Sequence, residues 1–295
     1  MLSICIPTYN YLVIKLVSEL HKQCQNNNID YEILILEDGS SNSFFSENAE
    51  NLSRFKNVKH ILFTENQGRS KTRNYLANLA QFDNLLFLDS DSEISDENFI
   101  NCYLNNIENS VICGGTIYLK SQKEKNKELR YKYGIISEML SVDTRTKNKI
   151  FTTNNFLIHK KIFEQIQFKE FLTKYGHEDS LFGYELRKNN INIKHINNPV
   201  IHAGIEENAV FLDKTRLAID NLIILNNQTT IDPNFINDIT LAKTYKKVKN
   251  LKLHYLLKGL FKIFKNIILK HLLNSKNPNI FVFNFYKLGY YTIMQ

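Results

Sequence analysis

Short apolar runs alternate with amphipathic stretches along the first half of the chain. The runs are rich in Ile, Leu, Val and Phe and are too short for helices, which indicates buried parallel strands. They span residues 2–6, 31–36, 58–63, 84–88 and 111–117. Apolar residues at helical spacing predict helices between them, at 10–24, 42–53, 69–81 and 96–107. This alternation predicts a doubly wound α/β sheet, in which ligands bind at the carboxyl ends of the strands.

The second half continues the pattern and then changes character. A strand is expected at 151–158, a helix at 175–189 and a pair of strands within 192–202. From about Leu253 to Leu273 apolar residues recur at spacings of three and four, which predicts one long amphipathic helix decorated with lysines. We therefore divide the chain into a domain at 1–228 and a basic C-terminal extension at 229–295.

The distribution of charged residues along the chain supports this division. The 295 residues include 37 Lys and Arg and 30 Asp and Glu, and the 43% of apolar residues is typical of a globular protein. Residues 239–295 contain 11 Lys and no acidic residue, so the rest of the chain has 26 basic and 30 acidic residues and a net charge of −4. A basic amphipathic helix at 252–273 could lie on an anionic membrane surface. It could equally pack on the first domain or on a second subunit.

Cysteine usage and the N-terminus bear on location. The four cysteines are far apart and form no CxxC pair, which argues against a zinc cluster and against a secreted disulfide framework. The first residues show no signal-peptide pattern, and no uncharged apolar stretch reaches the ~18 residues of a spanning helix. We expect a cytoplasmic protein, peripheral on the inner face of the cell membrane if its tail binds lipid.

Polar side chains follow each of the first four predicted strands. Asp89 and Asp91 come directly after the apolar run 85–88 and lie two residues apart, so both carboxylates can face one way. Carboxylate oxygens suit Mg²⁺ or Mn²⁺, which holds a diphosphate through its oxygens. An Asp-rich turn is the structural alternative, but the position at a strand exit favours a metal site.

Other candidate residues have a binding and a structural interpretation each. Asp38 ends the second strand, where it could accept an N–H from a nucleotide base or hold a turn. Arg73 lies near the start of a helix that could bind phosphate or be an ordinary surface helix. His202 could contact a metal or phosphate, although a lone His at a strand end is more often structural.

Two adjacent acids, Glu178 and Asp179, begin a predicted helix. The helix dipole favours acids there even in a structural role. A catalytic carboxylate at this place must be ionised near neutral pH and must reach the hydroxyl proton that it removes. The sequence lacks GxGxxG, GxxxxGK[ST] and GxSxG, which excludes the standard dinucleotide, P-loop and hydrolase-elbow motifs. The lysine tail has no recognisable nucleic-acid-binding module.

Five motifs occur in a fixed order. They are Ile6-Pro7-Thr8-Tyr9-Asn10, Glu37-Asp38-Gly39-Ser40-Ser41, Asn66-x-Gly68 to Arg73-Asn74, Asp89-Ser90-Asp91 and Gly176-His177-Glu178-Asp179. In this order and spacing, over roughly residues 1–225, the chain resembles the family 2 glycosyltransferases of GT-A fold. Two features depart from the usual pattern: Tyr175 is the aromatic residue before the acid pair, and His177 stands where Gly is common.

The resemblance implies a GT-A type α/β fold, with a doubly wound mixed sheet and flanking helices, followed here by the basic helical extension. It also implies roles for residues at matching positions. Pro7 and Thr8 would line the nucleotide base, Asp38 would accept from a uracil ring, and Arg73 would lie near base or ribose. Asp89 would approach the ribose, and Asp91, with Asp89 and His202, would bind the metal. Asp179 would be the general base and Glu178 would contact a sugar; Gly114, Gly115 and Asn154 are weaker candidates for the sugar pocket.

The implied activity is inverting transfer of a hexose or related sugar in cell-surface glycan synthesis. The donor would be a nucleotide diphosphate sugar, with uridine diphosphate favoured, and Mn²⁺ or Mg²⁺ would be the cofactor. The acceptor would be a saccharide or a lipid-linked molecule. Two alternatives stay open: a catalytically silent assembly partner at the membrane, and a haloacid-dehalogenase-like phosphotransferase, whose D-x-D motif normally stands near the N-terminus. Here 88 residues precede Asp89.

Overall fold

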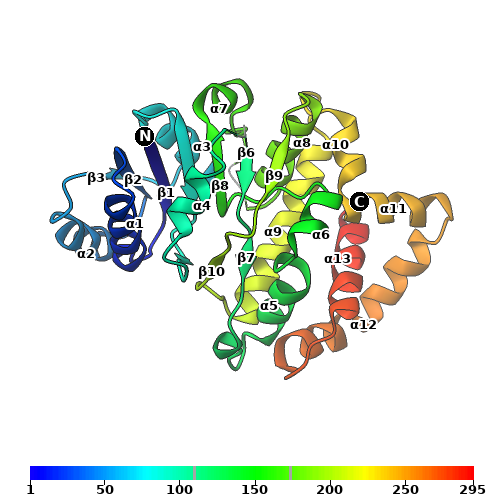
Figure 1. Ribbon diagram of the computed structural model, residues 1–295. Helices are drawn as coiled ribbons and strands as arrows, with labels where there is room; N and C mark the ends of the chain where they lie inside the picture. Colours follow the sequence, from blue (N-terminus) through cyan, green and yellow to red (C-terminus); the bar gives the residue numbers. More distant parts are fainter. Residues whose placement is uncertain (109–110, 173–174) are drawn as a thin grey trace. The chain divides into compact units, whose positions relative to one another are not determined.

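The computed structural model describes residues 1–108, 111–172 and 175–295, and it divides them into two compact units (Figure 1). The first unit contains the described residues of 1–118, 138–173 and 178–204, and the second contains those of 119–137, 174–177 and 205–295. The boundary expected after residue 228 stays a prediction, although the last stretch of the second unit begins earlier, at Ile205.

A seven-stranded mixed sheet forms the centre of the first unit. Its strand order is β3-β2-β1-β4-β8-β6-β9. The strands are β1 (Leu2–Thr8), β2 (Tyr31–Asp38), β3 (Val58–Phe63), β4 (Asn84–Leu88), β6 (Val111–Cys113), β8 (Asn155–His159) and β9 (Ile193–His195). The first four are mutually parallel, whereas β8 runs antiparallel to both β4 and β6. The carboxyl ends of β2, β1 and β4 therefore lie side by side, which brings their following loops to one edge.

Helices cover both faces of this sheet, as the alternating side chains of the strands require. In β1, Leu2, Ile4 and Ile6 pack with α1 and α4 on one face, and Cys5 points to the other. That second face is covered by α3, α7 and α8. The helices of this unit are α1 (Ile14–Asn26), α2 (Asn42–Leu52), α3 (Arg69–Leu79), α4 (Phe99–Leu104), α6 (Val142–Lys147), α7 (Lys160–Ile166) and α8 (Glu178–Lys188). The expected α/β fold with a mixed sheet and flanking helices is confirmed.

Three sequence-based expectations were wrong in detail. The run 111–117 is not one strand, because it breaks at Gly115, whose φ is +100°, and continues as β7 (Thr116–Ile117) in another sheet. That three-stranded sheet has the order β5-β10-β7, with β5 (Ser92–Glu93) and β10 (Val200–His202). The expected strand pair within 192–202 is therefore split, because β9 pairs with β6.

The third difference concerns the helix expected at 96–107, which is shorter in the structure. The carboxylate of Asp96 accepts a hydrogen bond from the backbone N–H of Asn98 at 2.8 Å. Such a side-chain turn competes with helical hydrogen bonding. The helix consequently begins only at Phe99.

The second unit is helical. It contains α5 (Glu128–Tyr133), α9 (Asn208–Asn226), α10 (Pro233–Asp238), α11 (Thr240–Asn250), α12 (His254–Asn274) and α13 (Ile280–Met294), besides a 3₁₀ turn at Lys120–Gln122. A π-helical turn at Gly134–Glu138 also lies here, except for its last residue, which belongs to the first unit. The long amphipathic helix expected from 253 to 273 is confirmed as α12. Its buried residues Phe261, Ile268 and Leu272 pack with Phe283 and Tyr286 of α13.

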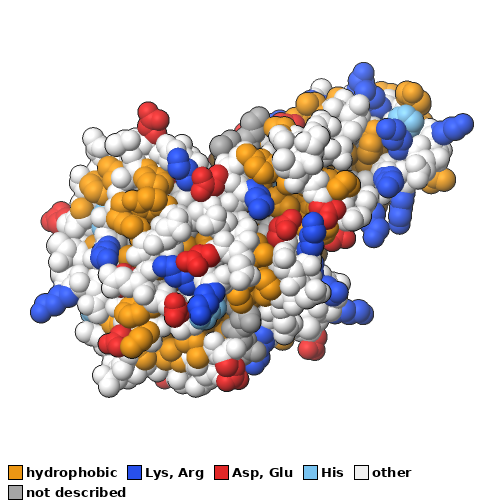
Figure 2. All heavy atoms as spheres, turned by 90° about the horizontal axis from the view of Figure 1, so that it is seen from above, with side chains coloured by type: hydrophobic (Ala, Val, Ile, Leu, Met, Phe, Trp, Pro, Cys, Tyr) orange, Lys and Arg blue, Asp and Glu red, His pale blue; other side chains and the backbone are white. Residues whose placement is uncertain are grey.

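The basic character of the tail is visible on the molecular surface. Helices α11 and α12 form one end of the second unit, and Figure 2 shows lysines beside apolar side chains at this end. Among the helices of residues 1–108, 111–172 and 175–295, none has both the length and the apolar composition that crossing a membrane requires.

Candidate active site

A buried arginine connects two of the predicted motifs. Arg73 in α3 is 1% exposed and donates a hydrogen bond from Nη2 to Oδ1 of Asp89 at 2.7 Å. Its guanidinium also lies 5.5 Å from the ring centroid of Phe168. Among the described residues, its Nε and Nη1 have no hydrogen-bond partner. Desolvating an arginine in this way is costly unless its charge faces acids.

The predicted acid pair lies at the start of α8. Asp179 is half-buried, and its carboxylate accepts a hydrogen bond from the backbone N–H of Ser180 at 2.6 Å. Loss of hydration raises the pKa of Asp179 to about 6, and the neighbouring Glu178 charge adds to the rise. Hydrogen bonds from Ser180 and the charge of Arg73 lower the pKa. Asp179 is therefore ionised at neutral pH and can bind a proton readily, as a general base must.

Glu178 is buried on the same helix turn. Its Oε1 lies 3.7 Å from Nη1 of Arg69, the first residue of α3. Its Oε2 is buried without a hydrogen-bond partner in the part of the chain that the structure describes. A buried carboxylate oxygen without a donor is suited to receive one from a ligand hydroxyl. The structure thus brings α3, the end of β4 and the start of α8 together.

Asp91 and His202 form a second pair. The His202 Nε2 lies 3.2 Å from Oδ2 of Asp91, and the His202 Nδ1 lies 3.4 Å from the hydroxyl of Tyr118. Tyr118 donates a hydrogen bond to Glu138. Gly204 leaves room for the carboxylate, because an added Cβ would be 2.4 Å from Oδ2 of Asp91. No signal in the sequence singled out this glycine.

The expected metal set is only partly assembled. Asp89 turns to Arg73, whereas Asp91 faces His202. Among the described residues, no three His, Cys, Asp or Glu side chains form a cluster that could hold a metal ion. Mg²⁺ is commonly held by one or two protein ligands together with substrate phosphates and waters. One carboxylate and one imidazole therefore fit a divalent ion that a diphosphate helps to hold.

The Asp38 side chain accepts hydrogen bonds from the backbone of this chain. Its Oδ1 accepts the backbone N–H of Gln67 at 2.6 Å and its Oδ2 accepts that of Gly68 at 3.0 Å. These contacts hold the loop that leads into α3. Because a carboxylate has about four acceptor positions, the same side chain can still accept a hydrogen bond from a nucleotide base. The binding role of Asp38 stays a prediction.

The loop after β1 has no charged group. Thr8 is buried and its hydroxyl donates to the carbonyl of Ile6 at 3.3 Å, and Pro7 is half-buried beside it. Asn10 has a φ of +48° and joins this loop to the next, because its side chain accepts the N–H of Ser41 at 2.8 Å. The predicted base-lining position of Pro7 and Thr8 is thus adjacent to the Asp38 loop.

The weaker sugar-pocket candidates are surrounded by protein. A Cβ added at Gly114 would lie 2.4 Å from Nδ2 of Asn155, and one at Gly115 would lie 2.9 Å from the guanidinium of Arg145. Packing therefore accounts for both glycines. Asn154 donates to the Thr116 hydroxyl at 2.7 Å. Their role in sugar binding stays a prediction.

Sequence reasoning missed a buried network around Glu37. This carboxylate is fully buried and accepts from Nδ2 of Asn48 at 2.6 Å, with Nε2 of His60 at 3.2 Å and Ser40 in contact. Burial opposes ionisation, but His60, Ser40 and Asn48 outweigh it and lower the pKa of Glu37. Glu37 therefore carries a charge that fixes the loop after β2.

The turn before the acid pair is also tightly held within the second unit. Gly176 and His177 have φ values of +97° and +72°. The carbonyl of Gly176 accepts from Nδ2 of Asn221 in α9 at 2.6 Å, and an added Cβ would be 2.6 Å from that of Ala218. A positive φ explains why glycine is common where His177 stands.

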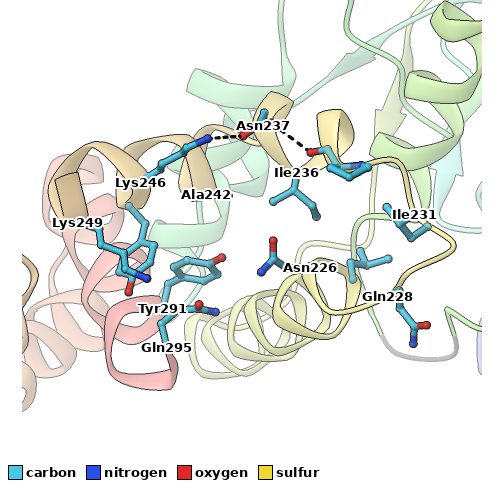
Figure 3. A pocket seen from close by; sticks show the side chains of 13 residues that line it. Asn226, Gln228, Ile231, Ile236, Asn237, Ala242, Lys246, Lys249, Tyr291 and Gln295 are labelled. Atoms are coloured by element: carbon cyan, nitrogen blue, oxygen red, sulfur yellow. Dashed lines mark hydrogen bonds between the residues drawn. The ribbon is translucent and has the colours of Figure 1, made fainter.

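A cavity of about 400 Å³ lies elsewhere, among the helices of the second unit (Figure 3). Its lining includes Asn226, Asn237, Tyr245, Lys246 and Tyr291. None of the predicted site residues lines it.

Comparison with known proteins agrees with this geometry. The family model for glycosyl transferase family 2 matches residues 3–167, which is more than half of the chain. The chain belongs to this family. The match includes Asp38, Arg73, Asp89 and Asp91, whereas the acid pair and His202 lie beyond it. Family membership decides against the haloacid-dehalogenase-like alternative.

Solved structures of glycosyltransferases share the GT-A fold of this family 2 glycosyltransferase. A mannosyltransferase from Pyrobaculum calidifontis, PcManGT in complex with GDP-Man and Mn²⁺, is 11% identical, with a TM-score of 0.61 over 99% of this chain and 84% of that one. S. aureus TarS 1–349 is 16% identical, with a TM-score of 0.52 over 100% of this chain and 92% of that one. TarS 1–349 in complex with UDP-GlcNAc is 15% identical, with a TM-score of 0.53 over 98% and 90%. A search of curated proteins found no match.

Proposed function

We propose that this family 2 glycosyltransferase inverts the anomeric centre of its donor sugar, with Asp179 as the general base. The observation that supports this is the place of its carboxylate, half-buried at the start of α8 beside Glu178 and within electrostatic range of Arg73, where burial raises its pKa to about 6. A base of this strength is ionised at neutral pH and has more affinity for a proton than an ordinary aspartate. The positive charge of Arg73, which also donates a hydrogen bond to Asp89, lowers the pKa of Asp179 and so favours its ionised form.

The reaction needs one displacement step. Asp179 removes the proton from an acceptor hydroxyl while the oxygen attacks the anomeric carbon. The bond between that carbon and the diphosphate oxygen breaks, and its electron pair leaves with the nucleotide diphosphate. The proton remains on the Asp179 carboxylate until water removes it. No covalent intermediate with the enzyme is required, and attack opposite the leaving group inverts the configuration.

We infer that the donor is a nucleotide diphosphate sugar, with uridine diphosphate preferred. In support, TarS has been solved with UDP and with UDP-GlcNAc, and PcManGT with GDP-Man and Mn²⁺. The Asp38 carboxylate, together with Pro7 and Thr8, would bind the base. Asp91 and His202 would hold Mn²⁺ or Mg²⁺, which neutralises charge on the departing diphosphate when bound.

The acceptor would be a saccharide or lipid-linked molecule, and the reaction a hexosyl or related transfer in cell-surface glycan synthesis. We place this activity in the cytoplasm, on the inner face of the cell membrane. The basic, acid-free sequence of residues 239–295 supports a membrane setting, because anionic lipids attract clustered lysines.

Nucleotide-dependent thermal shift tests the donor and metal assignment. Ligands that bind only the native state stabilise it, by about 2.7 kcal/mol at a concentration of 100 Kd. We expect UDP with Mn²⁺ to raise Tm more than the guanosine, thymidine, cytidine or adenosine diphosphates. Asp91→Ala should remove the part of the shift that depends on Mn²⁺. A larger shift with GDP would reassign the base, and no shift with any nucleotide would favour the silent assembly partner.

A further inference from the structure

The outer face of α12 is apolar although its inner face already packs in the core of the second unit. Leu256, Leu260, Ile263 and Ile267 follow one another at spacings of four, three and four, which places them along one side of the helix. We call these four residues the outer stripe. Leu256, Ile263 and Ile267 are 61%, 71% and 66% exposed. A soluble helix normally exposes polar residues on this side.

The turn between α11 and α12 extends this apolar surface. Leu251 and Leu253 of this turn are exposed, and Tyr255 in the first turn of α12 is exposed to 77%. Tyrosine is enriched where one end of a side chain is in apolar surroundings and the other in water, as at a membrane interface. The outer stripe and this turn therefore expose apolar side chains on consecutive segments of the chain.

Exposed lysines lie on the same two helices. Residues 239–295 contain 11 Lys and neither Asp nor Glu. Lys243, Lys246, Lys247 and Lys249 of α11 are exposed, as are Lys262 and Lys270 of α12. Figure 2 shows these two classes of side chain, blue and orange, side by side at this end of the second unit. The combination of an exposed apolar stripe and many lysines is typical of helices that lie on anionic lipid surfaces.

We propose that the outer stripe and the α11–α12 turn dock on an anionic lipid surface, with the stripe entering the boundary between headgroups and acyl chains. Charge decides between lipid and a second copy of the chain. In a two-fold symmetric dimer the same patch meets itself, so the lysines of one copy would face those of the other. Nucleic acid would satisfy the lysines, but it offers nothing apolar to cover the stripe. Anionic lipid satisfies both features.

The exposed stripe and the lysines are a physical reason for the proposed membrane setting. The docking proposal rests on the proposed function only for its biological role. Vesicle binding and nucleotide binding are separate measurements. Failure of vesicle binding leaves the assignment of donor and base intact, and failure of nucleotide binding leaves the docking surface intact.

Flotation of the full-length chain with vesicles tests the proposal. Vesicles of phosphatidylcholine with phosphatidylglycerol should bind the chain, and vesicles of phosphatidylcholine alone should bind it far less. Leu256→Asn with Ile263→Asn should lower the partition coefficient about tenfold or more, because two apolar side chains no longer leave water. Lys262→Gln with Lys270→Gln should also lower it about tenfold, since each lysine near the surface contributes attraction.

Matched controls separate docking from general stickiness. Val210 and Leu217 of α9 are exposed and, like Leu256 and Ile263, seven residues apart. Val210→Asn with Leu217→Asn should change partitioning less than about twofold. All variants should retain the thermal shift with nucleotide, which shows that they fold.

Several results would overturn the proposal. One is the absence of binding to anionic vesicles, and another is an equal loss in the stripe and control pairs. A dimer in solution that the stripe pair dissociates would assign the surface to a second copy. Tight binding to duplex DNA that depends on the lysines but not on the stripe would assign it to nucleic acid.

Discussion

Arg73 in the first unit and the lysines of α12 in the second carry the same charge in opposite surroundings. The arginine is 1% exposed and is held by one acid at hydrogen-bonding distance, with a second acid within electrostatic range. Lys262 and Lys270 are exposed, and the last 57 residues, 239–295, contain no acid that could pair with them. Removal of the single buried charge of Arg73 is therefore costly to stability. The exposed lysines of the second unit act on their surroundings through their number.

This contrast has a consequence for substitution. A buried, paired charge interacts strongly with its partner because little water screens it, so changing one residue disturbs its neighbours. Exposed charges are screened by salt over about 8–10 Å and contribute additively. Substitutions of buried, paired charges in the first unit should therefore have large and specific effects, and substitution of one exposed lysine in the tail should have a small one.

The largest effect is expected at the predicted base. Asp179→Asn should lower kcat about 10²–10⁴-fold, since general base catalysis contributes that much. Affinity for the nucleotide should remain nearly unchanged, because the side chain acts on the acceptor. Removing a charge that is partly withdrawn from water should also raise Tm at pH 7 by ~2–5 °C. Transfer assays and thermal melts measure the two effects.

A matched control is available for that variant. Asp143 also lies in the first turn of a helix, α6, but it is exposed. Asp143→Asn should leave both kcat and Tm nearly unchanged. Undiminished transfer by Asp179→Asn would remove the residue from the catalytic role.

Two arginines of α3 test the effect of burial on stability. Arg73→Gln should lower the free energy of unfolding by about 2–4 kcal/mol, because it leaves Asp89 without its partner and empties a buried site. Arg69, four residues earlier, is half-exposed and lies 3.7 Å from Glu178. Arg69→Gln should cost less than about 1 kcal/mol. Urea unfolding measures both, and equal losses would contradict the assigned difference in burial.

Two glycines of the C-terminal helices test the packing of the second unit. An added Cβ at Gly289 would lie 2.2 Å from the buried ring of Phe261, whereas nothing lies within 4 Å of one at Gly259. Gly289→Ala should therefore destabilise the chain by about 1–3 kcal/mol through overpacking. Gly259→Ala should stabilise it by about 0.5–1 kcal/mol, because alanine favours a helix. Unfolding midpoints that move in the same direction would contradict the packing of α12 on α13.

The sequence predicted the sheet, the long C-terminal helix and the position of the strand-end residues, because these depend on local periodicity and on order along the chain. Asp38, Asp89 and Asp91, for example, follow apolar runs in the sequence and stand at or directly after the ends of β2 and β4. The direction of each strand could not be predicted from the sequence. Nothing in the apolar run at β8 distinguishes an antiparallel strand from a parallel one, since both are buried on two faces.

The remaining differences concern contacts between distant segments. Periodicity gave no sign that Asp89 turns to Arg73 while Asp91 faces His202, 111 residues further along the chain. The Glu37 network was missed for the same reason, because its partners Asn48 and His60 come from different elements. Side-chain pairing over such distances depends on the completed fold, which short sequence patterns do not encode.

The smallest expected effect is a shift in a pH profile. Transfer requires the ionised form of Asp179, whose pKa is about 6, so the rate should fall about tenfold per pH unit below that value. Burial is the main cause of the raised pKa, and the charge of Glu178 is the next. Glu178→Gln removes only that charge, so the acid limb should move to lower pH by less than about one unit. It should stay above the range of an ordinary aspartate, because burial remains. A limb that does not move, or moves to higher pH, would mean that the titrating group is not next to Glu178.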